Sequence, residues 1–278
     1  MLRALYTSLI FALLCNAPGT YSQPKPTVQQ AREYTFSVIE RKPLARALYT
    51  QGLEIHDGDL FLSSGGYNQS QLLRYDFASG QLKGRRHMDG RLFAEGLTIF
   101  NGKIYQLTWR RRLGLVYDLK TMQPEARWRL RGEGWGLTNN GRELIYSDGS
   151  DQLHFISPAD GSHLRSIRVT LNGQRIRNLN ELEWIDGQIW ANVWQTDRIL
   201  LIDPTSGVAT ASVDLGGLLP LPERKADTDV LNGIARDPAT GQVWVTGKRW
   251  PWLYRIELRP TKDGPPGEDE PTHSTNSR

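Results

Sequence analysis

Short apolar stretches, each closed by a tight turn and followed by a second apolar stretch, recur five times along the chain. The first stretches of the five units open with related residues, at 51–54 (QGLE), 95–98 (EGLT), 135–138 (WGLT), 180–183 (NELE) and 232–235 (NGIA). The turns that follow end in glycine, at 57–58, 101–102, 140–141, 186–187 and 240–241. Glycine tolerates the positive φ of two-residue hairpins, so each unit is predicted to begin with a β-hairpin.

Further strands rich in β-formers follow each hairpin, and no segment shows a convincing helical period. Small antiparallel sheets repeating every forty to fifty residues or so favour a five-bladed β-propeller, an all-β fold. The last unit lacks an outer strand, and the alternating segment 34–39 is predicted to supply it and close the ring. A β-sandwich is the alternative fold, but it gives no reason for five equivalent strand openings.

The N-terminus has the pattern of a secretory signal peptide. Residues 1–3 (MLR) precede an apolar stretch at 9–15, and small and polar residues follow at 17–22. We therefore expect residues 1–22 to be removed, with cleavage after Ala17 or Ser22 left open, and the protein to be exported, either to a periplasm or to the medium. No later apolar run is long enough to span a membrane, so we expect no membrane association after removal.

The predicted domain covers residues 33–260 and contains no internal linker. Residues 261–278 are rich in Pro, Gly, Ser, Thr and charge, and they have too few apolar side chains to offset the entropy of ordering. We expect this segment to be a disordered tail.

Composition excludes several kinds of chemistry. The one cysteine, Cys15, falls in the predicted signal peptide, which leaves no disulfide and no cysteine metal site in the mature protein. The five histidines have no metal-binding spacing, and neither a G-x-S-x-G motif nor a phosphate-binding loop is present. The formal charge of +4 is scattered except at 110–112, which gives nucleic-acid binding little support. We expect no cofactor and no catalytic metal.

Two sets of residues are predicted to meet at one mouth of the ring, because the start of a blade's first strand and the end of its second strand share a face. The first set is Gln51, Glu95, Trp135, Asn180 and Asn232. The second, seven residues after each turn glycine, is Gly65, Trp109, Asp148, Trp194 and Lys248. Positions that only fill a hydrophobic core would be aliphatic, so this mixture of polar and aromatic residues indicates a functional site. Other interpretations stay open: Asp148 could only make a turn, Asn232 could bond backbone, and the tryptophans could pack between blades.

At these positions the sequence resembles the glutaminyl-peptide cyclotransferases of the plant and bacterial type, which are five-bladed propellers unrelated to the zinc-dependent animal enzymes. The matching strings are T-Q-G-L at Thr50, F-A-E-G-L-T at Phe93, T-W at Thr108, G-W-G-L at Gly134, S-D-G at Ser147, N-E-L-E-W at Asn180, W-A-N-V-W-Q-T-D at Trp190, D-V-L-N-G-I-A at Asp229 and V-T-G-K-R-W-P at Val245. Two departures are Tyr49, where the family usually has Phe, and the loop at 64–68.

The resemblance implies an enzyme that closes the N-terminal glutamine of peptides or proteins into pyroglutamate and releases ammonia, without a metal. It implies that Glu95 is the general acid/base. We assign Lys248, Gln51 and Asn180 to the catalytic set with it. Gln51 and Asn180 would hold the γ-amide and the tetrahedral oxygen, and Lys248 would either stabilise that oxygen or orient Glu95, in roles that stay interchangeable. The predicted substrate-binding residues are Trp109, Trp135, Trp194, Phe93, Tyr49, Asp148 and Asn232. We expect a monomer.

Two rival functions follow from the same residues. A lactonase-like hydrolase would use Glu95, Asp148, Asn180 and Asn232 to hold calcium through oxygen ligands, and a chelator would inactivate it. A non-catalytic propeller would stack a peptide or sugar on the three tryptophans and release it unchanged.

Overall fold

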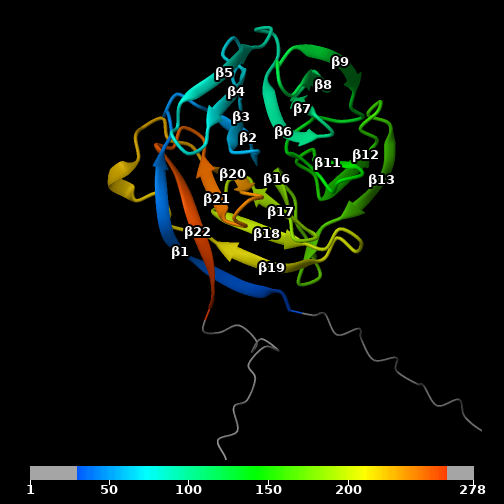
Figure 1. Ribbon diagram of the computed structural model, residues 1–278. Coiled ribbons are helices and arrows are strands. Elements are labelled where there is room, and N and C mark those ends of the chain that lie inside the picture. The colour runs from blue at the N-terminus through cyan, green and yellow to red at the C-terminus, as the bar shows by residue number, and fades with distance from the viewer. Residues whose placement is uncertain (1–29, 262–278) are drawn as a thin grey trace, which may run out of the picture.

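Antiparallel sheets built from consecutive strands account for nearly all of the structure (Figure 1). The computed structural model describes residues 30–261, so the predicted signal peptide at 1–22 and nearly all of the predicted tail lie outside the described residues. The first sheet contains β2 (Thr50–His56), β3 (Asp59–Ser64), β4 (Gln71–Asp76) and β5 (Leu82–His87). The second contains β6 (Ala94–Phe100), β7 (Lys103–Thr108), β8 (Leu113–Asp118) and β9 (Pro124–Arg129). The third contains β10 (Leu137–Asn139), β11 (Leu144–Ser147), β12 (Gln152–Ile156) and β13 (His163–Arg168).

An eight-stranded sheet completes the arrangement, and it joins two groups of four strands. Its order is β16 (Leu179–Ile185), β17 (Gln188–Val193), β18 (Arg198–Ile202), β19 (Ala209–Asp214), β1 (Arg32–Pro43), β22 (Trp252–Pro260), β21 (Val243–Gly247) and β20 (Leu231–Arg236). A small hairpin, β14 (Thr170–Leu171) and β15 (Gln174–Arg175), and a 3₁₀ helix, η1 (Leu221–Glu223), lie in the connections. The all-β prediction is confirmed, and the sheets match the five-unit repeat when the large sheet is counted as two units. Among the described residues, no helix has the length and apolar character needed to cross a membrane.

The N-terminal strand β1 holds the two halves of the large sheet together. It runs antiparallel to β22, from the pair Tyr34 and Pro260 to the pair Pro43 and Trp252. Its first residues also run parallel to β19, with Arg32 opposite Ala211. The outer strand predicted at 34–39 is therefore present and is longer than the sequence pattern indicated.

Glycines allow the inner strands to approach closely around the axis. A Cβ atom on Gly52 of β2 would lie 2.4 Å from the backbone nitrogen of Leu97 in β6, and one on Gly136 would lie 1.9 Å from the carbonyl oxygen of Asn180. A Cβ atom on Gly96 of β6 would lie 2.4 Å from the backbone nitrogen of Leu137. No side chain fits in these spaces, so close backbone approach explains the glycine in three of the four glycine-containing strand openings.

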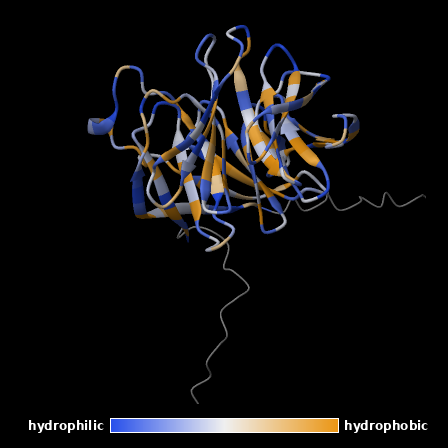
Figure 2. Ribbon diagram, turned by 45° about the horizontal axis from the view of Figure 1, so that its top comes forward, coloured by the Kyte–Doolittle hydropathy of each residue, from blue (hydrophilic) through white to orange (hydrophobic). Residues whose placement is uncertain are grey.

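Apolar side chains fill the spaces between neighbouring sheets. Leu60 and Leu62 of the first sheet pack with Trp244 of β21, and Leu107 of the second packs with Tyr146 of the third. Figure 2 shows the apolar residues along the strands and the hydrophilic ones in many of the connecting loops. Each fully buried large side chain contributes about 1.5–3 kcal/mol, so this inter-sheet packing is the main source of stability.

Three glutamates join the inner strands around the axis through backbone hydrogen bonds. Glu181 of β16 accepts from the backbone nitrogens of Leu53 in β2, at 3.3 Å, and Ile234 in β20, at 2.9 Å. Glu54 of β2 accepts from Ile99 in β6 at 3.0 Å, and from the Thr98 hydroxyl. Glu183 accepts from the backbone nitrogen of Arg236 at 2.9 Å. These carboxylates connect strands that are far apart in the sequence.

Burial raises the pKa of all three carboxyl groups: that of Glu54 rises from 4.5 to about 7, and those of Glu181 and Glu183 rise well above 4.5. Proximity adds to the effect, since Glu183 raises the pKa of Glu181 and Glu54 raises that of Glu183. Each group binds its proton more tightly in the folded than in the unfolded protein.

This shift predicts a pH-dependent stability. The contribution of a carboxyl group with a raised folded pKa is complete below its unfolded pKa and is lost as the pH rises through the folded pKa. Between pH 4.5 and about 7, the free energy of unfolding should therefore fall. The Glu54→Gln variant keeps an oxygen acceptor for Thr98 and Ile99 but does not ionise. At the upper end of this range, its loss of unfolding free energy should therefore be smaller than that of the wild type by about 1–3 kcal/mol.

Urea unfolding across this pH range measures the effect. Glu257→Gln, at an exposed carboxylate of β22, is the matched control and should follow the wild-type pH dependence. If the unfolding free energy of Glu54→Gln fell with pH as steeply as that of the wild type, Glu54 would not titrate in this range.

Candidate active site

A cavity of about 240 Å³ opens where the inner strands begin. Its lining residues are Tyr49, Gln51, Phe93, Glu95, Trp109, Trp135, Asn180, Trp194 and Lys248. Gln51, Glu95 and Asn180 lie near the starts of β2, β6 and β16, whereas Trp109, Trp194 and Lys248 directly follow β7, β17 and β21. The structure thus brings together all four predicted catalytic residues and five of the seven predicted substrate-binding residues.

Aromatic rings form the walls of the cavity in edge-to-face pairs. The centroids of Trp135 and Trp194 lie 5.6 Å apart with their planes at 87°, and those of Phe93 and Trp109 lie 5.6 Å apart at 68°. Tyr49 contacts Phe93 in the same manner, with centroids 6.2 Å apart. Such pairs are favourable beyond the area that they bury, so they stabilise the walls of the cavity.

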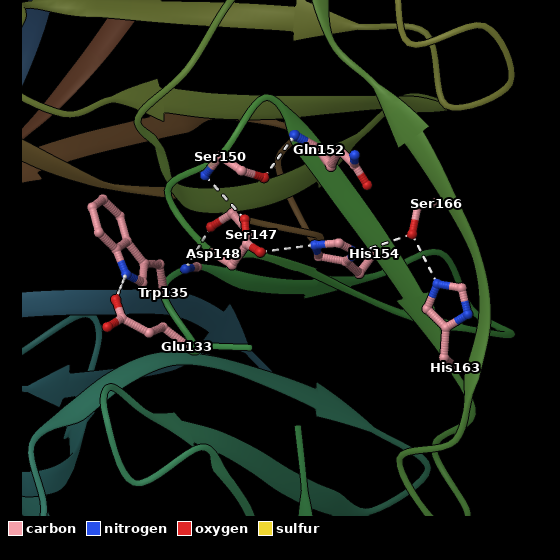
Figure 3. A network of polar contacts seen from close by, with 10 residues as sticks. Glu133, Trp135, Ser147, Asp148, Ser150, Gln152, His154, His163 and Ser166 are labelled. Atoms are coloured by element: carbon pink, nitrogen blue, oxygen red, sulfur yellow. Dashed lines mark hydrogen bonds and ion pairs between the residues drawn. The ribbon is translucent and has the colours of Figure 1, made fainter. Parts of the chain in front are cut away.

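The carboxylate of Glu133 anchors two of the indoles and was not found by the sequence analysis. Its Oε2 accepts hydrogen bonds from Nε1 of Trp109, at 2.7 Å, and from Nε1 of Trp135, at 3.1 Å. Figure 3 shows the bond to Trp135. Glu133 lies in the loop between β9 and β10, two residues before Trp135. One oxygen atom therefore fixes the relative position of two cavity walls.

Glu95 is a buried carboxyl group with an unused hydrogen-bonding atom. Its residue is 4% exposed, and Oε2 has no hydrogen-bond partner among the described residues. Burial raises the pKa of Glu95 well above 4.5, and the positive charge of Lys248 opposes this. The charge of Glu133 raises the pKa further, and a hydrogen bond to Gln51 lowers it. The sequence left open whether burial or Lys248 dominates, and in the structure burial does.

Lys248 is the cation of the site, and it is 3% exposed. Burial lowers its pKa, while the charges of Glu95 and Asp229 oppose the shift. Its Nζ lies 5.0 Å from the centroid of the Tyr49 ring. The Tyr49 hydroxyl donates to Oδ2 of Asp229 at 2.7 Å, which holds this ring beside Lys248.

The amides differ in their surroundings. Asn180 lines the cavity, and its buried Oδ1 has no partner among residues 30–261. Asn232 lies behind the lining: its Nδ2 donates to the carbonyl of Thr50 at 2.9 Å and to Oε1 of Gln51 at 3.2 Å. Asn232 therefore bonds to Gln51 and does not itself line the cavity, while its buried Oδ1 has no partner among the described residues.

Asp148 is also outside the cavity lining, in the turn that follows β11. Its Oδ2 lies 3.1 Å from Nε2 of His154, and its Oδ1 accepts from the backbone nitrogen of Ser150 (Figure 3). The turn that it forms contains Gly149, where a Cβ would lie 2.7 Å from the Trp135 indole. The turn interpretation of Asp148 fits this geometry, and the turn supports the Trp135 wall.

Asp148 is separate from the other proposed calcium ligands, because its carboxylate bonds to Ser150 and His154 and does not line the cavity that holds Glu95 and Asn180. In the described part of the chain, no group of three or more His, Cys, Asp or Glu residues has an arrangement suited to a metal ion.

Comparison with known proteins identifies the family. The sequence model described as glutamine cyclotransferase matches residues 9–258. The chain belongs to the glutamine cyclotransferase family. A relative, the glutaminyl-peptide cyclotransferase of Arabidopsis thaliana, is 37% identical over 228 residues, which cover 80% of this chain and 71% of the relative. The solved glutaminyl cyclase of Myxococcus xanthus superposes with a TM-score of 0.79 at 33% identity, over 84% of this chain and all of that one.

For this cyclotransferase family member, the surroundings of Glu95 predict two opposite pKa shifts. Glu133→Gln keeps an oxygen acceptor for both indoles but removes the negative charge, so the pKa of Glu95 should fall. Lys248→Met removes the positive charge, so the pKa should rise. Carbon-13 NMR of carboxyl-labelled glutamate measures both, with the Glu95 signal assigned by its absence from Glu95→Gln.

Glu125→Gln, which removes a carboxylate on β9, is the control and should not change the pKa of Glu95. Shifts in the same direction for Glu133→Gln and Lys248→Met would contradict this electrostatic account.

Proposed function

We propose that this protein is an exported enzyme that converts the N-terminal glutamine of peptides or proteins into pyroglutamate and releases ammonia. The observation that carries the proposal is the buried Glu95, which keeps an oxygen without a partner among the described residues and lines an indole-walled cavity together with Asn180 and Lys248. Family membership and the glutaminyl cyclases of Arabidopsis thaliana and Myxococcus xanthus support it.

Cyclisation joins two groups of the same residue. The neutral α-amine attacks the γ-carboxamide carbon, a carbon–nitrogen bond forms, and the bond to the amide nitrogen breaks. The enzyme's first task is to hold the folded-back conformer, because oriented intramolecular attack has a large rate advantage. The edge-to-face walls formed by Trp109, Trp135 and Trp194 are suited to this task, since they leave a narrow apolar space.

The second task is proton transfer, because the amide nitrogen leaves only as ammonia. Glu95 accepts the proton that the amine loses on attack and donates it to the departing nitrogen. A carboxyl group with a raised pKa is closer in proton affinity to an α-amine, which titrates near pH 8, so both transfers are accessible.

The third task is to stabilise the tetrahedral oxygen that forms on the γ-carbon. Lys248 supplies a buried positive charge, which is most effective where water is excluded. Asn180 offers Oδ1 as an acceptor for the γ-amide hydrogens. Gln51 lines the same cavity, and a hydrogen bond from Asn232 holds its side chain in place.

Export is the second part of the proposal, and the signal-peptide pattern at residues 1–22 supports it. We further propose that the mature protein acts as a monomer whose cavity lining comes from a single chain. Cell fractionation of the full-length protein and light scattering of the mature form test these two statements.

Glu95→Gln should reduce turnover by about a hundred- to ten-thousandfold, because it removes the proton shuttle while it keeps the shape of the side chain. The assay is ammonia release and the loss of one ammonia from the mass of a short peptide that begins with glutamine. Wild-type activity should persist with a chelator, and the variant should keep the wild-type circular dichroism and unfolding midpoint. A variant with near-normal turnover would refute the shuttle, and a wild-type protein without ammonia release would refute the function.

A further inference from the structure

A second cavity lies directly beside the candidate active site. It has a volume of about 310 Å³ and is formed by the turn after β17, the segment before β20 and the turn after β21. Its polar lining comprises Gln195, Thr196, Asp197, Arg224, Thr228 and Asp229. It therefore differs from the aromatic active-site cavity in chemical character.

The two cavities share a wall. Gln195 of the second cavity follows Trp194 of the first in the chain. Asp229 of the second accepts the hydroxyl hydrogen of Tyr49 from the first at 2.7 Å, and its backbone nitrogen donates to the carbonyl of Lys248 at 3.1 Å. A chain that leaves the mouth of the active site on this side meets the second cavity next.

The turn that carries Gln195 and Asp197 is firmly held. Gln195 has a φ of 66°, in the left-handed region that non-glycine residues seldom adopt. The backbone nitrogen and hydroxyl of Thr196 both donate to the carbonyl of Val193, at 3.1 Å and 2.7 Å. A strained residue persists where surrounding bonds fix it, and such residues gather at ligand sites.

Charge makes the mouth asymmetric. On the side of the second cavity, Asp197 and Asp229 form no ion pair within 4.0 Å among residues 30–261, and Arg249 pairs with Asp227 instead. One cation, Arg224, lines the cavity, and its Nε donates to the carbonyl of Leu219. On the other side, the guanidinium of Arg110 lies 4.1 Å from the Trp109 ring. Asp197 therefore offers a basic side chain a negative charge without an ion pair on the former side, whereas the guanidinium of Arg110 would repel it on the latter.

We propose that the second cavity binds the second or third residue of the substrate peptide and favours a basic side chain there. The proposal rests on the cyclotransferase function above. An extended chain advances about 3.3–3.6 Å per residue, and the two cavities share a wall, so the residues directly after a glutamine held in the first cavity are the ones placed to meet the second. The acceptors of Asp197, Asp229 and Gln195 suit an ammonium or guanidinium group.

Steady-state kinetics on three tetrapeptide amides test the proposal: each begins with glutamine and carries lysine, alanine or glutamate at both of the next two positions. Glutamine amide, which lacks the following residues, is the fourth substrate. For the wild-type enzyme at low salt, kcat/KM should be about two- to fivefold higher for the lysine than for the alanine peptide, through KM, and the difference should shrink as salt is added.

Asp197→Asn should reduce this preference, and Asp197→Lys should reverse it in favour of the glutamate peptide. Asp57→Asn is the matched control, since it makes the same charge change at a hairpin tip outside both cavities, at a φ of 48° that asparagine accepts. It should keep the wild-type preference.

Equal kcat/KM for the three peptides, or a lysine preference that both Asp197 variants keep, would overturn the subsite. Turnover of glutamine amide separates this result from failure of the proposed function, because a wild-type enzyme that turns over the amide without peptide preference lacks only the subsite.

Discussion

The close approach of the inner strands at the axis is the constraint on which the rest of the structure depends. Where Gly52 and Gly136 stand, a Cβ would lie within 2.4 Å of a neighbouring backbone atom, so the strands meet without side chains between them. This contact places the starts of β2, β6 and β16 around one point. Gln51, Glu95 and Asn180 consequently share a cavity although they are far apart in the chain. Packing between sheets stabilises the ring, but the axial contact positions the site.

The carboxylates around the axis have two different roles, which follow from their hydrogen-bond partners. Glu54, Glu181 and Glu183 accept from backbone nitrogens of neighbouring strands and so connect the units. Glu95 keeps an oxygen without a partner among the described residues and faces the cavity. Burial raises the pKa of all four, yet only the group with a free oxygen is available to exchange a proton with a substrate.

Much of this arrangement is readable in the sequence, because the repeat carries both the fold and the positions of the mouth. The recurring glycine and the turn pairs indicated the hairpins, and counting from each turn glycine found Trp109, Trp194 and Lys248. The same count placed Asp148 and Asn232 at the cavity surface, where the structure instead gives them supporting positions. The repeat along the chain predicts where the backbone of each strand lies. It does not predict which group a side chain contacts, because that group belongs to a neighbouring unit. Glu133 escaped detection for this reason, since it lies in a loop and its role depends on two indoles from different units.

The most direct test of the account is a crystal structure of the Glu95→Gln variant with a peptide that begins with glutamine. We expect the N-terminal residue to lie folded back between the indoles, with its γ-amide nitrogen about 2.6–3.2 Å from the side chain at position 95 and its α-amine against the γ-carbon. A peptide bound with an extended N-terminal residue, or with its terminus outside the cavity lined by Trp109, Trp135 and Trp194, would contradict it.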